Sequence, residues 1–408
     1  MHVLGNNYRS EFLAVPQLIR FDSVNQENSL RPTLLLKSNT LLLKYILLGV
    51  RMQLAFVICN GRLLYALRVF DNENEGGVLW SIAQNQKELE AIVSITQGKK
   101  IDVFLFNELA LNVSWATVPL SGVLSSLRTM TRQVEYGHYS SEKMYPAVDK
   151  LLKSLHEGTN TEWITFEIGG KHDWKRFRNH MITESASSSL IDLFDEDEGN
   201  QQEQIGIWLT DGLNPLGVWH SPQRPYKDGQ TRELTDILMS YENGPVLIES
   251  KALAILTRAS LPNREKLARK IAKHISKAFG QLEGGIKKLK NGVEITDIDG
   301  NVLKISREKP AHAIVLVPDL DLIEDREKYG LEFIKSFMEK TGAFPHILDI
   351  SELLRVVQSA EKIAKSGTTT TPMMAFDFYL MERLEQAATA NSLAVSYTHL
   401  TLPTICSV

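Results

Sequence analysis

The chain has 408 residues, of which 43% are hydrophobic and 23% are charged, so it is long enough for two or three domains with apolar cores. Its formal net charge of -4 excludes a surface covered with basic residues, and any nucleic-acid binding must therefore come from a local patch. Cys59 and Cys406 are too few for a disulfide framework or an all-cysteine metal site. They fit a reducing compartment, which predicts a cytoplasmic protein.

Residues 1–122 are predicted to form a mainly β domain. The apolar segment 41–50 is interrupted by Lys44 and is shorter than the roughly 20 residues of a membrane span, so we expect a buried strand and no membrane partner. Asn60 and Gly61 separate two apolar runs, which favours a tight hairpin. The same patterns predict strands at 101–106 and 111–118 and a helix at 88–97. No catalytic constellation occurs here, so a specificity, sensing or assembly role with protein partners stays open.

Residues 123–204 are predicted to be a helical connector that includes a flexible acidic loop. Helical spacing runs over 123–157 and ends near Gly158. Residues 184–204 are rich in Ser, Asp, Glu and Gln, a composition typical of a flexible loop.

Residues 205–394 alternate between strand and helix patterns, which predicts an α/β domain. A hairpin around Asp299 and Gly300 is expected at 293–305. The other predicted elements are strands at 217–220, 233–240, 245–251, 313–317 and 346–350, and helices at 263–290, 327–340 and 351–365. Residues 395–404 resemble the translation of a sequencing adaptor, so 395–408, with His399 and Cys406, are expected to be an artefact that replaces the native C-terminus.

Two neighbouring predicted strands carry charged residues on apolar faces. Period-two alternation places Asp236 between Leu234 and Leu238 on one strand, and Glu249 beside Lys251 on the next. A buried carboxylate needs a partner or a cation. Asp236 and Glu249 can share Mg²⁺ or Mn²⁺, and Lys251 can orient the metal-bound water or neutralise charge that develops on a phosphate.

An acid followed two residues later by lysine also occurs by chance. A second copy, Asp173 and Lys175, follows an apolar segment that Gly169 and Gly170 interrupt, so we expect it in a polar turn. The alternative for the first copy is a core ion pair without catalytic function.

The pattern resembles the PD-(D/E)xK, or restriction-endonuclease-like, superfamily over about residues 204–320. The resemblance implies a mixed sheet flanked by helices, and Mg²⁺-dependent hydrolysis of DNA by an endonuclease in prokaryotic defence or repair. Asp236 and Glu249 match the metal-binding acids, Lys251 matches the catalytic lysine, and Ser250 would add a backbone carbonyl ligand. Thr235 stands where the family often has proline. A further glutamate on an earlier helix has two candidates, Glu157 and Glu203.

The helix after this motif is basic on its polar faces. A basic helix beside the site would attract a phosphate backbone, and a solvated helix face is the alternative. The candidate DNA-binding residues are Lys270, Lys273, His274 and Lys277. The resemblance adds Gln281 as a catalytic candidate, because several family members use a glutamine on this helix.

Two functions remain from the sequence. One is a DNA phosphodiesterase, and the other is a catalytically inactive nuclease-fold protein that binds nucleic acid or acts as a scaffold. Neither a phosphate-binding Gly-Lys loop nor a nucleophile elbow is present. The histidines at 172, 180, 220 and 312 lack zinc-site spacing, and Asp319 and Asp321 fit a turn equally well.

Overall fold

The computed structural model of the chain describes residues 4, 6–26, 29–71, 76–98, 100–121, 125–132, 134–137, 141–159, 162–182, 188–258, 260–366 and 369–394. The expected artefact at 395–408 lies outside these residues. The described chain is mixed α/β and divides into two compact units. Unit 1 comprises residues up to 178 with 192–194 and 258–264, and unit 2 comprises 179–191, 195–257 and the residues from 265 onward.

Unit 1 contains two mixed or antiparallel sheets, one with the strand order β1-β2-β6-β7-β9 and one with the order β5-β4-β3-β8. Its strands are β1 (Leu18–Gln26), β2 (Ser29–Lys37), β3 (Met52–Cys59), β4 (Arg62–Val69), β5 (Gly77–Ile82), β6 (Lys100–Phe106), β7 (Asn112–Pro119), β8 (Ile164–Ile168) and β9 (Lys175–Arg176). Its helices are α1 (Asn6–Ala14), α2 (Thr40–Leu47), α3 (Gln86–Gly98), α4 (Ser125–Thr131) and α5 (Ser141–Glu157).

The hairpin predicted at Asn60 and Gly61 is confirmed. Cys59 pairs with Arg62 across β3 and β4, and the two turn residues have φ values of +48° and +76°. The strand expected at 41–50 is wrong, because residues 40–47 form α2. The Asn39 side chain accepts a hydrogen bond from the Leu42 amide and caps this helix. A short apolar run has no alternation that would distinguish a buried strand from a buried helix.

The single helical stretch expected at 123–157 is divided into α4 and α5, and α5 does end before Gly158. The acidic loop expected at 184–204 is also wrong over its described part. Residues 188–192 form β11 (Ser188–Asp192), which pairs with β10 (Arg178–Ile182), and α6 (Glu198–Asp211) follows. The acids there have specific partners: Arg176 binds Asp192, and Glu198 accepts from the Ile255 amide.

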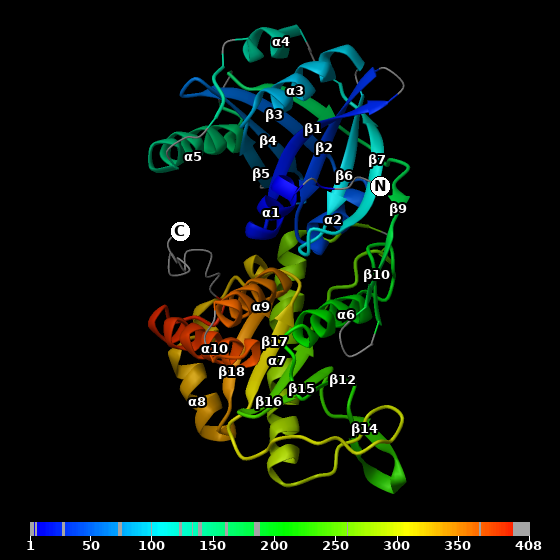
Figure 1. Cartoon of the computed structure of the whole chain (residues 1–408), viewed down its shortest axis with the longest axis vertical. Helices are drawn as coiled ribbons and strands as arrows, with labels where there is room; N and C mark the ends of the chain where they lie inside the picture. The colour runs from blue at the N-terminus through cyan, green and yellow to red at the C-terminus, as the bar shows by residue number, and fades with distance from the viewer. Residues whose placement is uncertain are drawn as a thin grey trace. The chain divides into compact units, whose positions relative to one another are not determined.

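Unit 2 is built on a five-stranded sheet with the order β12-β15-β16-β17-β18 (Figure 1). Pairing is antiparallel from β12 to β16 and parallel from β16 to β18. Its main strands are β12 (Gly217–His220), β15 (Ile237–Tyr241), β16 (Gly244–Ser250), β17 (His312–Val317) and β18 (Phe344–Asp349). The remaining elements are β13 (Gln223–Pro225), β14 (Thr231–Glu233), α7 (Arg264–Lys290), α8 (Leu331–Thr341), α9 (Ile350–Lys365) and α10 (Pro372–Thr389), with short 3₁₀ turns at 227–229, 320–322 and 327–329.

Helices pack on both faces of this sheet. A Cβ on Gly206 of α6 would meet the Ile237 side chain, whereas a Cβ on Gly285 of α7 would meet the Leu247 side chain. Ile237 and Leu238 alternate between faces, and Leu238 is the register partner of Leu247. The helix α6 therefore covers one face and α7 the other. No helix in the described ranges has the length and apolar character needed to cross a membrane.

In unit 2 one strand begins later than expected, one hairpin is shorter than expected, and one helix was not expected. The strand expected from 233 begins at Ile237, because residues 231–233 belong to the separate strand β14. The hairpin expected at 293–305 is present in a short form, with an antiparallel bridge between Thr296 and Val302 and a hydrogen bond of 2.8 Å from the Leu303 amide to the Ile295 carbonyl. The sequence also gave no indication of α10, whose first turn is capped by the Thr371 hydroxyl.

Candidate active site

Asp236, Glu249 and Lys251 lie together at one edge of the unit 2 sheet. The register pair Ile237 and Ile248 places the residue before β15 beside the end of β16. The Lys251 ammonium donates to Glu249 Oε2 at 2.6 Å and to Asp236 Oδ2 at 3.2 Å. Asp236 immediately precedes β15 rather than lying within it.

Backbone contacts hold this cluster in place. The Ser250 amide donates to Asp236 Oδ2 at 2.6 Å, and the Lys251 amide donates to the Leu316 carbonyl at 2.8 Å. The Thr235 hydroxyl donates to the Ile248 carbonyl at 2.9 Å. The side chains of Thr235 and Asp236 therefore both attach the turn before β15 to the backbone of β16.

The cluster is largely shielded from water. The side chains of Asp236 and Lys251 are 13% and 14% exposed, and that of Glu249 is 1% exposed. Burial, followed by the negative charge of Asp236, raises the pKa of Glu249 to about 7, although Lys251 acts in the opposite direction. Burial also raises the pKa of Asp236. Burial alone would lower the pKa of Lys251, but the two carboxylates raise it. The amine is therefore the charged partner of two acids that compete for it.

The two candidates for an additional glutamate lie in different units. Glu157 ends α5 of unit 1, whereas Glu203 lies in α6 of unit 2. Glu203 Oε2 is 2.7 Å from His220 Nε2, and the charge of Glu203 contributes to the raised pKa of Asp236. Glu203 is thus within electrostatic reach of the cluster. Among the described residues no group of three or more His, Cys, Asp and Glu side chains is arranged to hold a metal.

The predicted amphipathic character of α7 is confirmed. Its apolar stripe is buried, comprising Leu267, Ile271, Ile275, Ala278, Leu282 and Ile286. The pKa of His274 is lowered mainly by burial, and the charges of Lys270, Lys251 and Lys277 lower it further. His274 is therefore within electrostatic reach of two of the predicted DNA-binding lysines and of Lys251.

The other predicted residues on α7 are less closely tied to the cluster. Lys273 is exposed on the same helix. Gln281 Oε1 is buried without a hydrogen-bond partner, and in the described part of the chain no hydrogen bond joins Gln281 to the cluster. The Ser250 hydroxyl and His274 Nδ1 are likewise buried without a partner among the described residues.

The competing candidates have structural explanations. Lys175 pairs with Asp173 on the surface, where their side chains are 55% and 86% exposed. His312 is buried between His346 and Asp377, at ring-nitrogen distances of 2.9 and 2.8 Å. Asp319 caps the 3₁₀ turn at 320–322 by accepting from the Asp321 amide.

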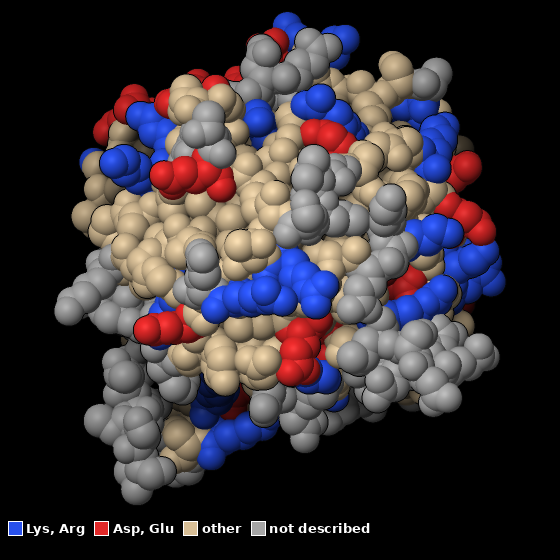
Figure 2. Space-filling model, turned by 90° about the horizontal axis from the view of Figure 1, so that it is seen from above, with Lys and Arg blue, Asp and Glu red and all other residues tan. Residues whose placement is uncertain are grey.

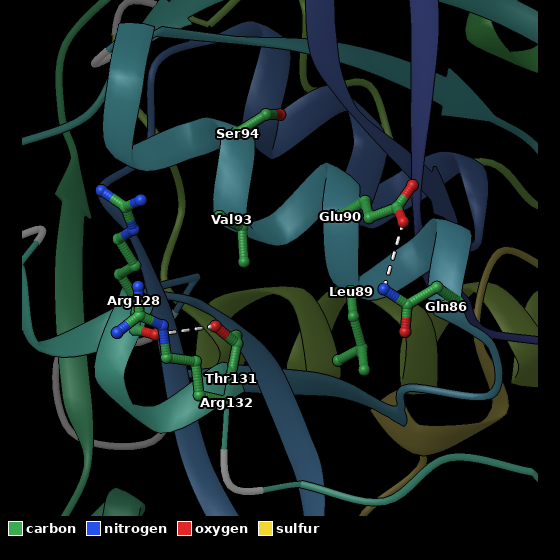
Figure 3. A pocket seen from close by; sticks show the side chains of 8 residues that line it. All are labelled: Gln86, Leu89, Glu90, Val93, Ser94, Arg128, Thr131 and Arg132. Atoms are coloured by element: carbon green, nitrogen blue, oxygen red, sulfur yellow. Dashed lines mark hydrogen bonds between the residues drawn. The ribbon is translucent and has the colours of Figure 1, made fainter.

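Unit 1 has a groove that the sequence did not indicate. It has a volume of about 510 Å³ and is lined by residues of α3 and by Arg128, Thr131 and Arg132 at α4 (Figure 3). Its acid, Glu90, accepts from Gln86 at 3.1 Å. On the face of the molecule in Figure 2, basic and acidic side chains are interspersed with wide uncharged areas. Neither feature assembles a catalytic set of residues.

Comparisons of this chain with models of protein families, with curated proteins and with solved structures find no match. The functional conclusion therefore depends on the geometry of unit 2.

Proposed function

We propose that unit 2 is a metal-dependent nuclease with a restriction-endonuclease-like fold that hydrolyses phosphodiester bonds of DNA. The observation that carries the proposal is the meeting of two carboxylates and one ammonium at the adjoining ends of β15 and β16. The mixed sheet with α6 and α7 on opposite faces supports the proposed fold. A cytoplasmic role in prokaryotic defence or repair remains part of the proposal, with unit 1 as a module for specificity, sensing or protein partners.

The donor set fits Mg²⁺ or Mn²⁺. Asp236 and Glu249 supply hard oxygen ligands, and one ammonium leaves their second negative charge uncompensated when both are ionised. The Ser250 backbone carbonyl is the third ligand that this proposal assigns. A bound cation would supply an activated water and would stabilise negative charge on the reacting phosphate.

The remaining chemistry belongs to side chains around this position. Lys251, which contacts both acids, is placed to hold the attacking water or to neutralise a phosphate oxygen. Lys270, Lys273 and Lys277 on α7 would attract the DNA backbone without reading its bases. His274 and Gln281 carry buried polar atoms that no described group satisfies, and substrate or water would provide their partners.

The test is a cleavage assay of the full chain on plasmid and linear DNA, with Mg²⁺, Mn²⁺ or EDTA. We expect cleavage that requires the metal and that falls by at least about a hundredfold in Glu249→Gln and in Lys251→Ala. Lys175→Ala is the matched control, because Lys175 stands in the same acid-x-Lys spacing on the surface. Metal-dependent cleavage that survives both substitutions would place the active site elsewhere.

A second candidate is favoured by the ion pairs themselves. Lys251 already satisfies both carboxylates, as expected of a structural network in a nuclease-fold protein that binds nucleic acid or serves as a scaffold without cleaving it. DNA binding without cleavage under every metal condition, together with unfolding of Lys251→Ala, would support this second function.

A further inference from the structure

A two-stranded ribbon lies just before Asp236 in the chain, and its second strand ends at Glu233. The strands β13 and β14 form this ribbon, and its tip contains Asp228 and Gly229 in left-handed conformations, with φ of +55° and +72°. At its base the Ser221 amide donates to the Asp236 carbonyl, and the Leu234 amide donates to the Pro222 carbonyl, both at 2.8 Å. The base of the ribbon is therefore anchored to the backbone of Asp236.

One face of the ribbon gathers positive charge around an aromatic ring. Arg224 and Arg232 are direct register partners, so their side chains project from the same face, and Tyr226 follows Arg224 by two residues on that face. Both guanidinium carbons lie over the Tyr226 ring, at 5.7 and 5.6 Å from its centroid. The tyrosine remains 44% exposed.

The two arginines place like charges opposite each other, and their contact with the Tyr226 ring offsets part of the repulsion. Like charges directly opposite each other on two strands repel, and no carboxylate in the described ranges forms an ion pair with either arginine. Glu233 pairs in register with Gln223 and so belongs to the opposite face, while Asp228 lies at the tip. Lys227, the residue after Tyr226, adds a further exposed cation to the ribbon. The face has the charge and the aromatic surface that a nucleic-acid strand would use.

We propose that this face, consisting of Arg224, Tyr226 and Arg232, binds a single-stranded stretch of DNA next to the site. The arginines would contact phosphates, and an unpaired base would stack against the exposed part of the tyrosine ring. A fully paired duplex offers no free base face to the ring, so single-stranded DNA is the favoured occupant. This inference rests on the proposed function, whose substrate class it makes more specific.

The sequence contains a signal for this face that the motif search did not use. Arg224 and Tyr226 have the spacing of residues on one side of a strand, and Arg232 follows a turn at Asp228 and Gly229. Short strands of two or three residues are too brief for alternation to be recognised before their pairing is known.

The experiment measures binding in the full chain with Glu249→Gln as background, so that DNA is not cleaved. Fluorescence anisotropy compares a labelled single strand of about 20 nucleotides with the same sequence as duplex. We expect Tyr226→Ala to weaken single-strand binding by about tenfold and duplex binding much less. For single-strand binding, the slope of log affinity against log salt concentration should decrease in magnitude by about one to two in the double variant Arg224→Gln/Arg232→Gln.

The matched control is Arg128→Gln/Arg132→Gln, which removes two exposed arginines of unit 1, one on α4 and one directly after it. Circular dichroism and thermal unfolding verify that each variant is folded. Unchanged single-strand affinity in the ribbon variants, or an equal loss on duplex, would overturn the inference. Cleavage of DNA by the wild-type chain is measured separately. Cleavage together with unchanged binding in the ribbon variants would refute only the proposed role of the ribbon. Binding that depends on the ribbon, without any cleavage, would refute only the proposed nuclease activity.

Discussion

Replacing Lys251 with methionine tests the electrostatic balance of the site. The substitution keeps most of the apolar stem but leaves Glu249, 1% exposed, and Asp236, 13% exposed, without their shared ammonium. Removing one partner of a buried ion pair typically costs about 3–5 kcal/mol when the remaining charge stays ionised. Protonation of Glu249 would reduce this destabilisation, and burial already raises the pKa of Glu249 to about 7.

The expected loss therefore depends on pH. An acid whose pKa is higher in the folded than in the unfolded chain lowers stability as pH rises from the unfolded toward the folded value. Here the pKa of Glu249 is near its ordinary value of 4.5 in the unfolded chain and about 7 in the folded chain, and loss of Lys251 raises the folded pKa further. We expect Lys251→Met to cost about 3–5 kcal/mol at about pH 8.5 and only about 1–2 kcal/mol at about pH 5.5.

Hydrogen exchange of peptides from β15 and β16 measures this loss within unit 2, independently of unit 1. Lys175→Met is the control, since its ion pair is exposed and should contribute less than about 1 kcal/mol at either pH. An equal loss of stability from Lys251→Met at both pH values would refute the reasoning, because it would mean that the destabilisation does not come from ionised carboxylates.

Three further predictions concern the metal affinity of the site, the packing of α7 and a buried arginine of unit 1. Mn²⁺ affinity, measured by calorimetry, should increase as pH rises through about 7, because the metal must displace the proton on Glu249; affinity that is flat with pH, or unchanged in Glu249→Gln, would contradict this. Gly285→Val should destabilise unit 2 by about 1–3 kcal/mol in urea unfolding, because even a Cβ at this position would approach Leu247 Cδ2 to 3.2 Å. Gly280→Ala is the contrasting variant: a Cβ there would have no atom within 4 Å, so we expect it to stabilise α7 by up to about 1 kcal/mol. Arg20→Met should lower the stability of unit 1 by about 3–5 kcal/mol in the same assay, since this 4% exposed guanidinium binds two glutamates, and an unchanged midpoint would show that they are satisfied without it.

Local patterns in the sequence predicted the parts of the structure that depend on neighbouring residues. The Asn60 and Gly61 hairpin follows from turn chemistry, and the stripe of α7 follows from helical period. The three charged residues were predicted to meet because two alternating segments were placed on adjacent strands. Their contact is observed, although Asp236 precedes its strand.

The errors come from interactions between residues distant in the sequence. The acidic segment was expected to be a loop on composition alone, but Asp192 is bound by Arg176, which lies on another strand. The strand predicted from 233 was too long, because Leu234 bonds back to Pro222 and separates β14 from β15. The pairing of His220 with Glu203 joins a strand to a helix, and no spacing rule links such positions. Local propensity cannot identify these partners.

Charge stoichiometry gives the best distinction between the two proposed functions. Among the described residues Lys251 is the ammonium that pairs with both acids, so above about pH 7, where Glu249 is ionised, the cluster carries one more negative than positive charge. Glu203 and Glu233 add negative potential, as their effect on the pKa of Asp236 shows. A core network under no functional constraint would be more stable with one acid replaced by an apolar residue. Retaining both carboxylates beside one amine is costly without a cation, and it is the arrangement that a divalent ion would stabilise.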